Sequence, residues 1–119
     1  MADWYQTLHP AVIRAIKEVI KAGMAAGIPV AVCGETAGSA FYVPLLIGLG
    51  ARELSMNVNS IQQIRRLVAG ISVNDAVQLV ESTDPLETAA EIEDSLRDYY
   101  LRNWEHLFPS GLLSSKYPQ

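Results

Sequence analysis

The chain has 119 residues, half of them hydrophobic and 18% charged, which suffices to bury the core of one small domain and argues against wholesale disorder. Thirteen acidic residues against nine basic ones give a formal net charge of −4, and no block of Lys or Arg stands out. This pattern excludes the basic patches that nucleic-acid binding requires. A single cysteine excludes an internal disulfide and a cysteine-based zinc cluster, and it fits a reducing compartment.

Nothing in the sequence indicates a membrane protein. The first residues lack the basic and apolar regions of a signal peptide. The longest apolar stretch, residues 41–49, contains Pro44 and Gly48 and is too short to cross a bilayer. His9 and His106 lie far apart and show no metal-ligand spacing. We therefore predict a soluble, cytoplasmic protein with no metal site of its own.

The first predicted element is a helix that starts at Pro10, because proline suits the first helical position, where its missing amide costs nothing. Gly27 can adopt the left-handed conformation that ends this helix. Residues 28–33 then form a continuous apolar run, which predicts a strand covered on both faces, as in a parallel sheet. The apolar residues of the helix recur at helical spacing, and they are Val12, Ile13, Ile16, Val19, Ile20 and Met24.

One more strand is predicted among the elements that follow. A glycine-containing loop over residues 34–39 leads into a short apolar helix over residues 40–49. Residues 53–56 then read as a second short strand. A predicted helix thus precedes each of the two strands.

Three further helices are predicted from their start signals. Ser60 starts a capping-box pattern, and Ser72 starts a second one. Asp84, followed by proline, predicts the start of the last and longest helix, which runs to about Leu107. Residues 110–119 lack periodicity and are predicted to form a loose tail.

The order of these elements predicts an α/β fold with two parallel strands joined by a right-handed crossover. Two strands alone would leave two unpaired sheet edges, which natural proteins avoid. Either other chains supply the missing strands, or these residues are one piece of a larger barrel. We divide the chain into residues 1–70, which hold both strands, and residues 71–119, a helical C-terminal extension with the tail.

The candidate site lies where the first predicted strand ends, because sites in parallel α/β proteins gather at the carboxyl ends of strands. Cys33 is the last strand residue, and Gly34 and Glu35 follow. A thiol there can exchange a proton with a ligand, and glycine lets the backbone approach that ligand. On residue type alone, Cys33 as a small buried hydrophobe and Glu35 as a loop carboxylate remain open. Asn57 and Asn59, after the second strand, are either pocket residues or helix caps.

Three motifs follow one another between residues 8 and 68. They are residues 8–12 with 16–20, residues 29–35 with 37–38, and residues 46–50 with 53–57 and 60–61. Together they resemble the end of the barrel domain of phosphoenolpyruvate-protein phosphotransferases, the enzyme I family of the bacterial phosphotransferase system, and most of all its nitrogen-branch form. After about Val73 the similarity is weak.

The resemblance implies that the chain is the C-terminal fragment of a TIM (β/α)8 barrel followed by extra helices. Enzymes of this family use magnesium and pass the phosphoryl group of phosphoenolpyruvate to a histidine and on to a histidine phosphocarrier protein, releasing pyruvate. The resemblance makes Cys33 the proton donor to enolpyruvate and gives Gly34 and Glu35 supporting roles. A thiol acting as a general acid must be protonated when phosphoryl transfer occurs.

The same resemblance assigns the other parts of the site to residues upstream of this chain. The arginine pair that holds the substrate, the metal-binding acidic residues and the phosphohistidine have no counterpart here. We therefore expect the fragment alone to bind no metal and to be inactive, and we expect it to form a homo-oligomer. Two alternatives stay open, namely a stand-alone oligomerising interaction module and a fragment of a pyruvate phosphate dikinase-like enzyme, which shares the cysteine-glycine-glutamate motif.

Overall fold

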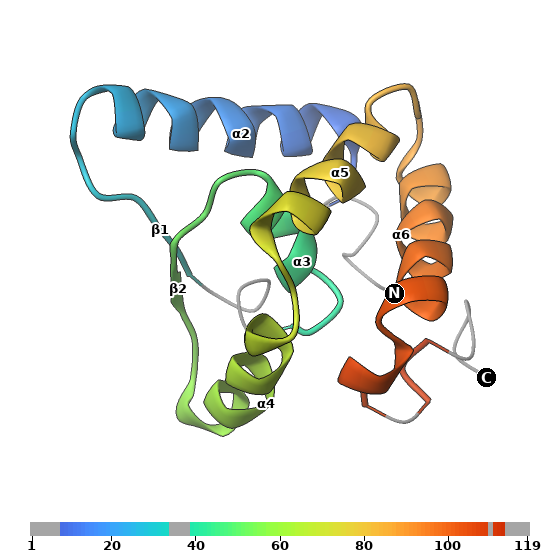
Figure 1. The fold of residues 1–119 in the computed structure, drawn as a ribbon. Helices are drawn as coiled ribbons and strands as arrows, with labels where there is room; N and C mark the ends of the chain where they lie inside the picture. The colour runs from blue at the N-terminus through green and yellow to red at the C-terminus, as the bar shows by residue number, and fades with distance from the viewer. Residues whose placement is uncertain (1–7, 34–38, 110, 114–119) are drawn as a thin grey trace.

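The structure is a computed structural model that describes residues 8–33, 39–109 and 111–113. These residues form an α/β structure in which helices pack on one side of a two-stranded sheet (Figure 1). The sequence predicted the α/β class. The elements in chain order are α2 (Pro10–Ala25), β1 (Ala31–Cys33), α3 (Val43–Gly48), β2 (Glu53–Ser55), α4 (Val58–Ala69), α5 (Val73–Thr83), α6 (Ala89–Asn103) and the 3-10 helix η1 (Glu105–Leu107).

The two strands pair in parallel, as the sequence predicted. Each is shorter than the predicted residues 28–33 and 53–56. The expectation that the first strand is covered on both faces is wrong for the described residues, because only Val32 and its partner Leu54 are half-buried, while their strand neighbours are exposed. Figure 1 shows the reason, since α3 and the helices around it lie on one side of the sheet.

Helix α2 begins and ends where its sequence signals predict. Pro10 occupies the first turn, and His9 caps the helix by accepting a hydrogen bond from the Ala11 amide at Nδ1, at 3.0 Å. Gly27 follows the helix with a φ of 70°, a conformation that favours glycine. The predicted apolar stripe is only partly covered, because Val19 and Met24 are 61% and 65% exposed.

The start of α4 differs from its prediction. The helix begins at Val58 rather than Ser60, and Asn57 is its cap, because the Asn57 Oδ1 accepts a hydrogen bond from the Ser60 amide at 3.2 Å. Asparagine and serine cap equally well, so the sequence offered two candidates three residues apart. Helix α5 starts as predicted, with Ser72 as its cap.

The last helix also starts later than predicted. Thr88, rather than Asp84, caps α6, and the Glu91 side chain completes the capping box by accepting from the Thr88 amide at 3.2 Å. The helix ends at Asn103, where Trp104 leaves the helical conformation, and η1 takes up the remainder of the predicted length. Helix α3 is shorter than the predicted residues 40–49 and carries Pro44 in its first turn.

Helix α3 lies at the centre of the core. Its first five residues are all buried, and α5 packs directly against it. The two backbones approach each other at Gly48, where an added Cβ atom would collide with the Ala76 carbonyl oxygen and would lie 2.5 Å from the Val80 Cγ2. The close packing of α3 and α5 therefore requires glycine at position 48.

A group of aromatic rings forms the second part of the core. The Tyr100 ring is fully buried, with its centroid 5.3 Å from that of Phe41 and 4.7 Å from that of Phe108. Burial raises the pKa of Tyr100 well above its ordinary value of 10.0, with a smaller contribution from Tyr42. Burial, and then the charge of Glu93, also raises the pKa of Tyr42.

We expect Gly48→Ala to lower the free energy of unfolding by about 1–3 kcal/mol, the usual cost of overpacking a core. The better helix propensity of alanine offsets this by no more than about 1 kcal/mol. Gly70→Ala is the matched control, because its Cβ would meet only the Leu107 side chain, whose nearest atom lies at 2.7 Å and can move. Urea unfolding checks both variants, and an equal effect of the two would contradict the close approach of α3 and α5.

We expect the free energy of unfolding to fall as the pH rises above about 10. In the unfolded chain Tyr42 and Tyr100 ionise near that pH, whereas burial keeps them protonated in the folded chain. The unfolded state then binds fewer protons, so each tyrosine lowers the stability by about 1.4 kcal/mol per pH unit. Urea unfolding between pH 9 and 11.5 measures the slope. Tyr100→Phe should make it shallower, and an unchanged slope would refute this role of Tyr100.

Candidate functional site

The Cys33 thiol lies at the carboxyl end of β1 and is exposed. This differs from the buried small hydrophobe that a lone cysteine on an apolar strand usually is. The predicted supporting residues Gly34 and Glu35 lie outside the described residues. A thiol at the end of a parallel strand, open to one side, is accessible to a molecule bound over that end of the sheet.

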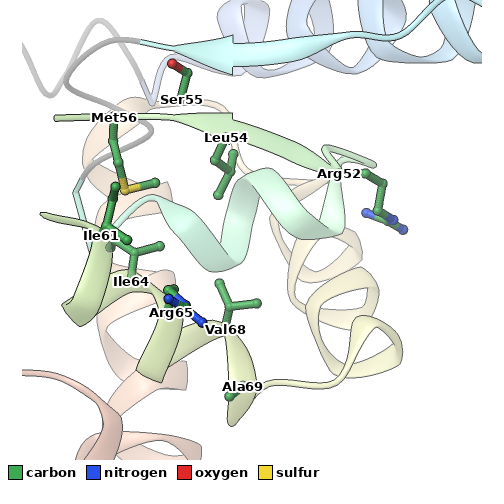
Figure 2. A pocket seen from close by; sticks show the side chains of 9 residues that line it. All are labelled: Arg52, Leu54, Ser55, Met56, Ile61, Ile64, Arg65, Val68 and Ala69. Carbon is green, nitrogen blue, oxygen red and sulfur yellow. The ribbon is translucent and has the colours of Figure 1, made fainter. Parts of the chain in front are cut away.

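Ser55 is the nearest polar neighbour across the strand pair. The parallel register places it opposite Cys33, as Glu53 is placed opposite Ala31. Side chains alternate along a strand, so these four residues share one face of the sheet, and all four are exposed. Figure 2 shows the Ser55 hydroxyl on the opposite side of β2 from Leu54. We call Ala31, Cys33, Glu53 and Ser55 the open sheet face.

The sequence alone did not identify Ser55 as part of this group. Its position two residues after Glu53 indicates that both side chains share a face of their own strand. Which residue of β1 lies opposite depends on the register, and a shift of one residue would have placed Ser55 beside Val32 instead. The register is a pairing between residues far apart in the sequence, so no local motif predicts it.

A pocket of about 670 Å³ lies behind β2, between this strand and α4 (Figure 2). Its apolar wall comes mainly from Leu54 and from α4, and Cys33 does not line it. Arg52 stands at its rim, where its Nη1 donates hydrogen bonds to the carbonyl oxygens of Ile47 and Ala51, at 3.1 and 2.8 Å. Of the four residues of the open sheet face, Ser55 alone is among those that line this pocket. Its lining residues are Arg52, Leu54, Ser55, Met56, Ile61, Ile64, Arg65, Val68 and Ala69.

The two asparagines after the second strand do not join Cys33. Asn57 is the cap of α4, where its Oδ1 accepts from the Ser60 amide and hydroxyl, and Asn59 is an exposed residue of the helix itself. His9 caps α2, and His106 is exposed in η1. The interpretation of Asn57 as a cap is thus confirmed, and the site within the described residues consists of the open sheet face.

The open sheet face offers no metal site. Within residues 8–33, 39–109 and 111–113, no three His, Cys, Asp or Glu side chains come close enough to hold a metal ion. The donors present therefore do not fit the magnesium that the resemblance implies. In the same part of the chain, no helix has the length and apolarity needed to cross a membrane.

Comparison of the sequence with those of known proteins identifies its family. Residues 1–73 match the family described as PEP-utilising enzyme, PEP-binding domain, and this match includes both strands and Cys33. The chain is 38% identical over 95 residues to a phosphoenolpyruvate-protein phosphotransferase of Staphylococcus carnosus. It is 39% identical over 90 residues to one of Chlamydia pneumoniae and 36% identical over 99 residues to one of Haemophilus influenzae.

These matches cover 76–83% of this chain but only 16–17% of each relative. The chain thus spans about one sixth of the length of the curated relatives that it matches. The family match covers more than half of the chain, and the resemblance that the sequence motifs carried is confirmed. The chain belongs to the family of PEP-utilising enzymes, within their PEP-binding domain.

Proposed function

We propose that this chain is the C-terminal part of a phosphoenolpyruvate-protein phosphotransferase, in which Cys33 protonates enolpyruvate. The observation that carries the proposal is the exposed thiol at the carboxyl end of a parallel strand, inside the segment that matches a PEP-binding domain. The complete enzyme moves the phosphoryl group of phosphoenolpyruvate to a histidine and on to a phosphocarrier protein. The similarity to several phosphoenolpyruvate-protein phosphotransferases favours this activity over that of a dikinase.

The proposed architecture is a TIM (β/α)8 barrel of which this chain supplies two strands. The open sheet face then becomes part of the barrel interior, where side chains from successive strands meet in layers. Strands supplied by the preceding part of the protein pair with the outer edges of β1 and β2. This accounts for a sheet with helices on one side only, because the other side faces the barrel axis.

The proposed proton transfer runs from the Cys33 thiol to a carbon atom of enolpyruvate. When the phosphoryl group leaves phosphoenolpyruvate, enolpyruvate remains and needs a proton at its methylene carbon. The Cys33 S–H bond breaks as the new C–H bond forms, and the resulting thiolate takes a proton from water to reset the site. Gly34 gives the ligand space at the backbone, and Glu35 orients neighbouring groups. The Ser55 hydroxyl, opposite Cys33 in the register, lies within the same layer.

The remaining parts of the site belong to the preceding part of the enzyme. The described residues offer no donor set for magnesium, so residues outside them hold it, together with the substrate's phosphate and carboxylate. The exposed apolar side chains of Val19, Met24 and Val58 support self-association, which we propose for the chain as for the enzyme. Its proposed location is the cytoplasm.

A second candidate function is a stand-alone oligomerising module. The same exposed apolar side chains favour it, since a module would bury them against a second copy. The module needs no catalytic role for Cys33, whereas the enzyme part needs one. The substitution of Cys33 therefore separates the two candidates.

We expect Cys33→Ala to stop pyruvate release without stopping phosphorylation. The test protein is the Staphylococcus carnosus relative with its matching segment replaced by this chain. Loss of the general acid should slow pyruvate release by about 10²–10⁴-fold, while the phosphohistidine still forms at a nearly unchanged rate. Rapid quench with labelled phosphoenolpyruvate measures both steps, and the unsubstituted chimera is the control. Equal loss of both steps, or of neither, would remove Cys33 from the proton-donor role.

We expect the chain alone to show neither phosphoenolpyruvate binding nor phosphoryl transfer, because its described residues offer no metal site and the family resemblance assigns the phosphate-holding groups to the preceding part of the enzyme. Calorimetric titration with phosphoenolpyruvate and Mg²⁺ checks binding, and labelled phosphocarrier protein checks transfer. The chimera serves as the positive control. Any phosphoryl transfer by the chain alone would show that the site is complete within these 119 residues.

A further inference from the structure

Residues 40–43, which follow Cys33 in the sequence, are buried in the core. Phe41 and Tyr42 are 1% and 6% exposed, and both precede α3. The amides of Tyr42 and Val43 donate to the Ser39 carbonyl oxygen at 3.1 and 3.3 Å, so residues 39–43 form a tight turn.

Helix α6 holds this turn from a distant part of the sequence. The buried Tyr100 hydroxyl donates a hydrogen bond of 2.7 Å to the Phe41 carbonyl oxygen, 59 residues away in the chain. The two rings also meet edge to face, with centroids 5.3 Å apart. A buried hydrogen bond of this length, combined with ring packing, fixes both the backbone and the side chain of Phe41.

Arg97, one turn before Tyr100 on the same helix, supports Phe41 from a second side. Its guanidinium carbon lies 5.4 Å from the centroid of the Phe41 ring, within the range of a cation–π contact. The guanidinium is itself held by Glu93, with Nη1 3.0 Å from Oε2, and the two side chains are only 12% and 7% exposed. A buried, paired arginine stays in place, so its contact with Phe41 is a fixed feature of the packing.

These contacts come from outside residues 1–73, the segment that matches the family described as PEP-utilising enzyme, PEP-binding domain. Helix α6 covers Ala89–Asn103, and the matches to the phosphotransferases, which span 90–99 residues, extend beyond residue 73 as well. The spacing of Glu93, Arg97 and Tyr100 places them along one face of α6, and the Thr88 capping box sets where that helix begins. The C-terminal helices therefore contribute a specific set of contacts to the turn after the Cys33 segment.

We propose that Tyr100 and Arg97 are positioning residues that anchor the turn of residues 39–43, which lies six to ten residues after Cys33 in the sequence. Pairing with β2 fixes the position of Cys33 itself. That this anchoring assists proton transfer rests on the proposed function of Cys33, but the anchoring itself does not.

The first experiment measures the anchoring in the chain of 119 residues. Tyr100→Phe removes only the hydroxyl, so amide hydrogen exchange at Tyr42 and Val43 should become about five- to tenfold faster relative to the slowest core amides. Arg97→Lys keeps the charge but loses the planar guanidinium over Phe41, and it should act in the same direction. Unchanged exchange at both amides in both variants would overturn the proposal.

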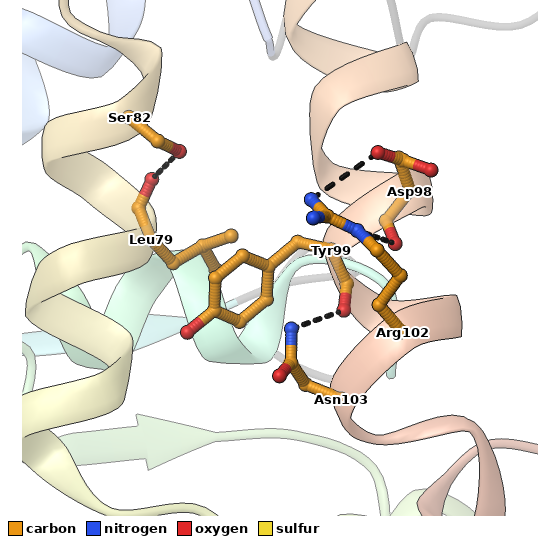
Figure 3. A network of polar contacts seen from close by, with 6 residues as sticks. All are labelled: Leu79, Ser82, Asp98, Tyr99, Arg102 and Asn103. Carbon is orange, nitrogen blue, oxygen red and sulfur yellow. Dashed lines mark hydrogen bonds and ion pairs between the residues drawn. The ribbon is translucent and has the colours of Figure 1, made fainter.

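Tyr99→Phe is the matched control. Tyr99 neighbours Tyr100 but extends toward Leu79 of α5, as Figure 3 shows. The contact from Asn103 Nδ2 reaches the backbone oxygen of Tyr99, at 3.0 Å, and survives the substitution. Tyr99→Phe should therefore leave exchange at Tyr42 and Val43 unchanged. If it accelerated them as Tyr100→Phe does, the effect would be general loosening of α6 and the proposal would fail.

The second experiment uses the chimera and separates the two reaction steps. Tyr100→Phe should slow pyruvate release about three- to tenfold and leave phosphohistidine formation unchanged, a split that simple destabilisation would not produce. If Cys33→Ala shows the expected loss but Tyr100→Phe does not, the positioning role is refuted and the proposed function stands. If Cys33→Ala itself has no effect on pyruvate release, the proposed function fails, and the exchange data alone decide whether the anchoring exists.

Discussion

The parallel pairing of β1 with β2 is the interaction on which the rest of this structure depends. It sets the register that places Ser55 opposite Cys33, and it directs four side chains to one exposed face. Parallel pairing requires a crossover, and α3 fills it with side chains that are almost all buried. Because α3 is apolar around its circumference, it must be covered, and α5 covers it at the close approach of Gly48. The crossover that contains α3 thus joins the two strands and also forms the centre of the helical layer.

The uncovered side of the sheet follows from the same constraint. Helices pack on the side of Val32 and Leu54, and they leave Cys33 and Ser55 without a layer above them. A monomer that ended here would expose a strand pair with two free edges, which is a poor arrangement for an independent domain. In the enzyme that we propose, the remaining length of the relatives would supply the other strands. Under that proposal, other parts of the protein complete the site around the exposed thiol.

The sequence predicted those features that local chemistry determines. Pro10, Gly27 and Ser72 marked helix ends because each acts on its own backbone or on amides within one turn. Ser60 and Asp84 were wrong as helix starts, because Asn57 and Thr88 are also residues that cap helices and they occupy the cap positions in the structure. The strand register and the contact between Phe41 and Tyr100 could not be predicted, since they depend on the lengths and packing of everything between them.

The predicted division into residues 1–70 and 71–119 stays a prediction, and buried residues of both parts belong to one core. The first part carries the strands and the match to the PEP-binding family. The second part covers the first, since α5 packs on α3 and α6 holds Phe41 through Tyr100. A site residue at a strand end needs neighbours that limit its motion, and those neighbours need not belong to the segment that defines the chemistry. In this chain the exposed Cys33 thiol lies in the first part and the contacts that hold Phe41 come from the second, and one buried core joins the two.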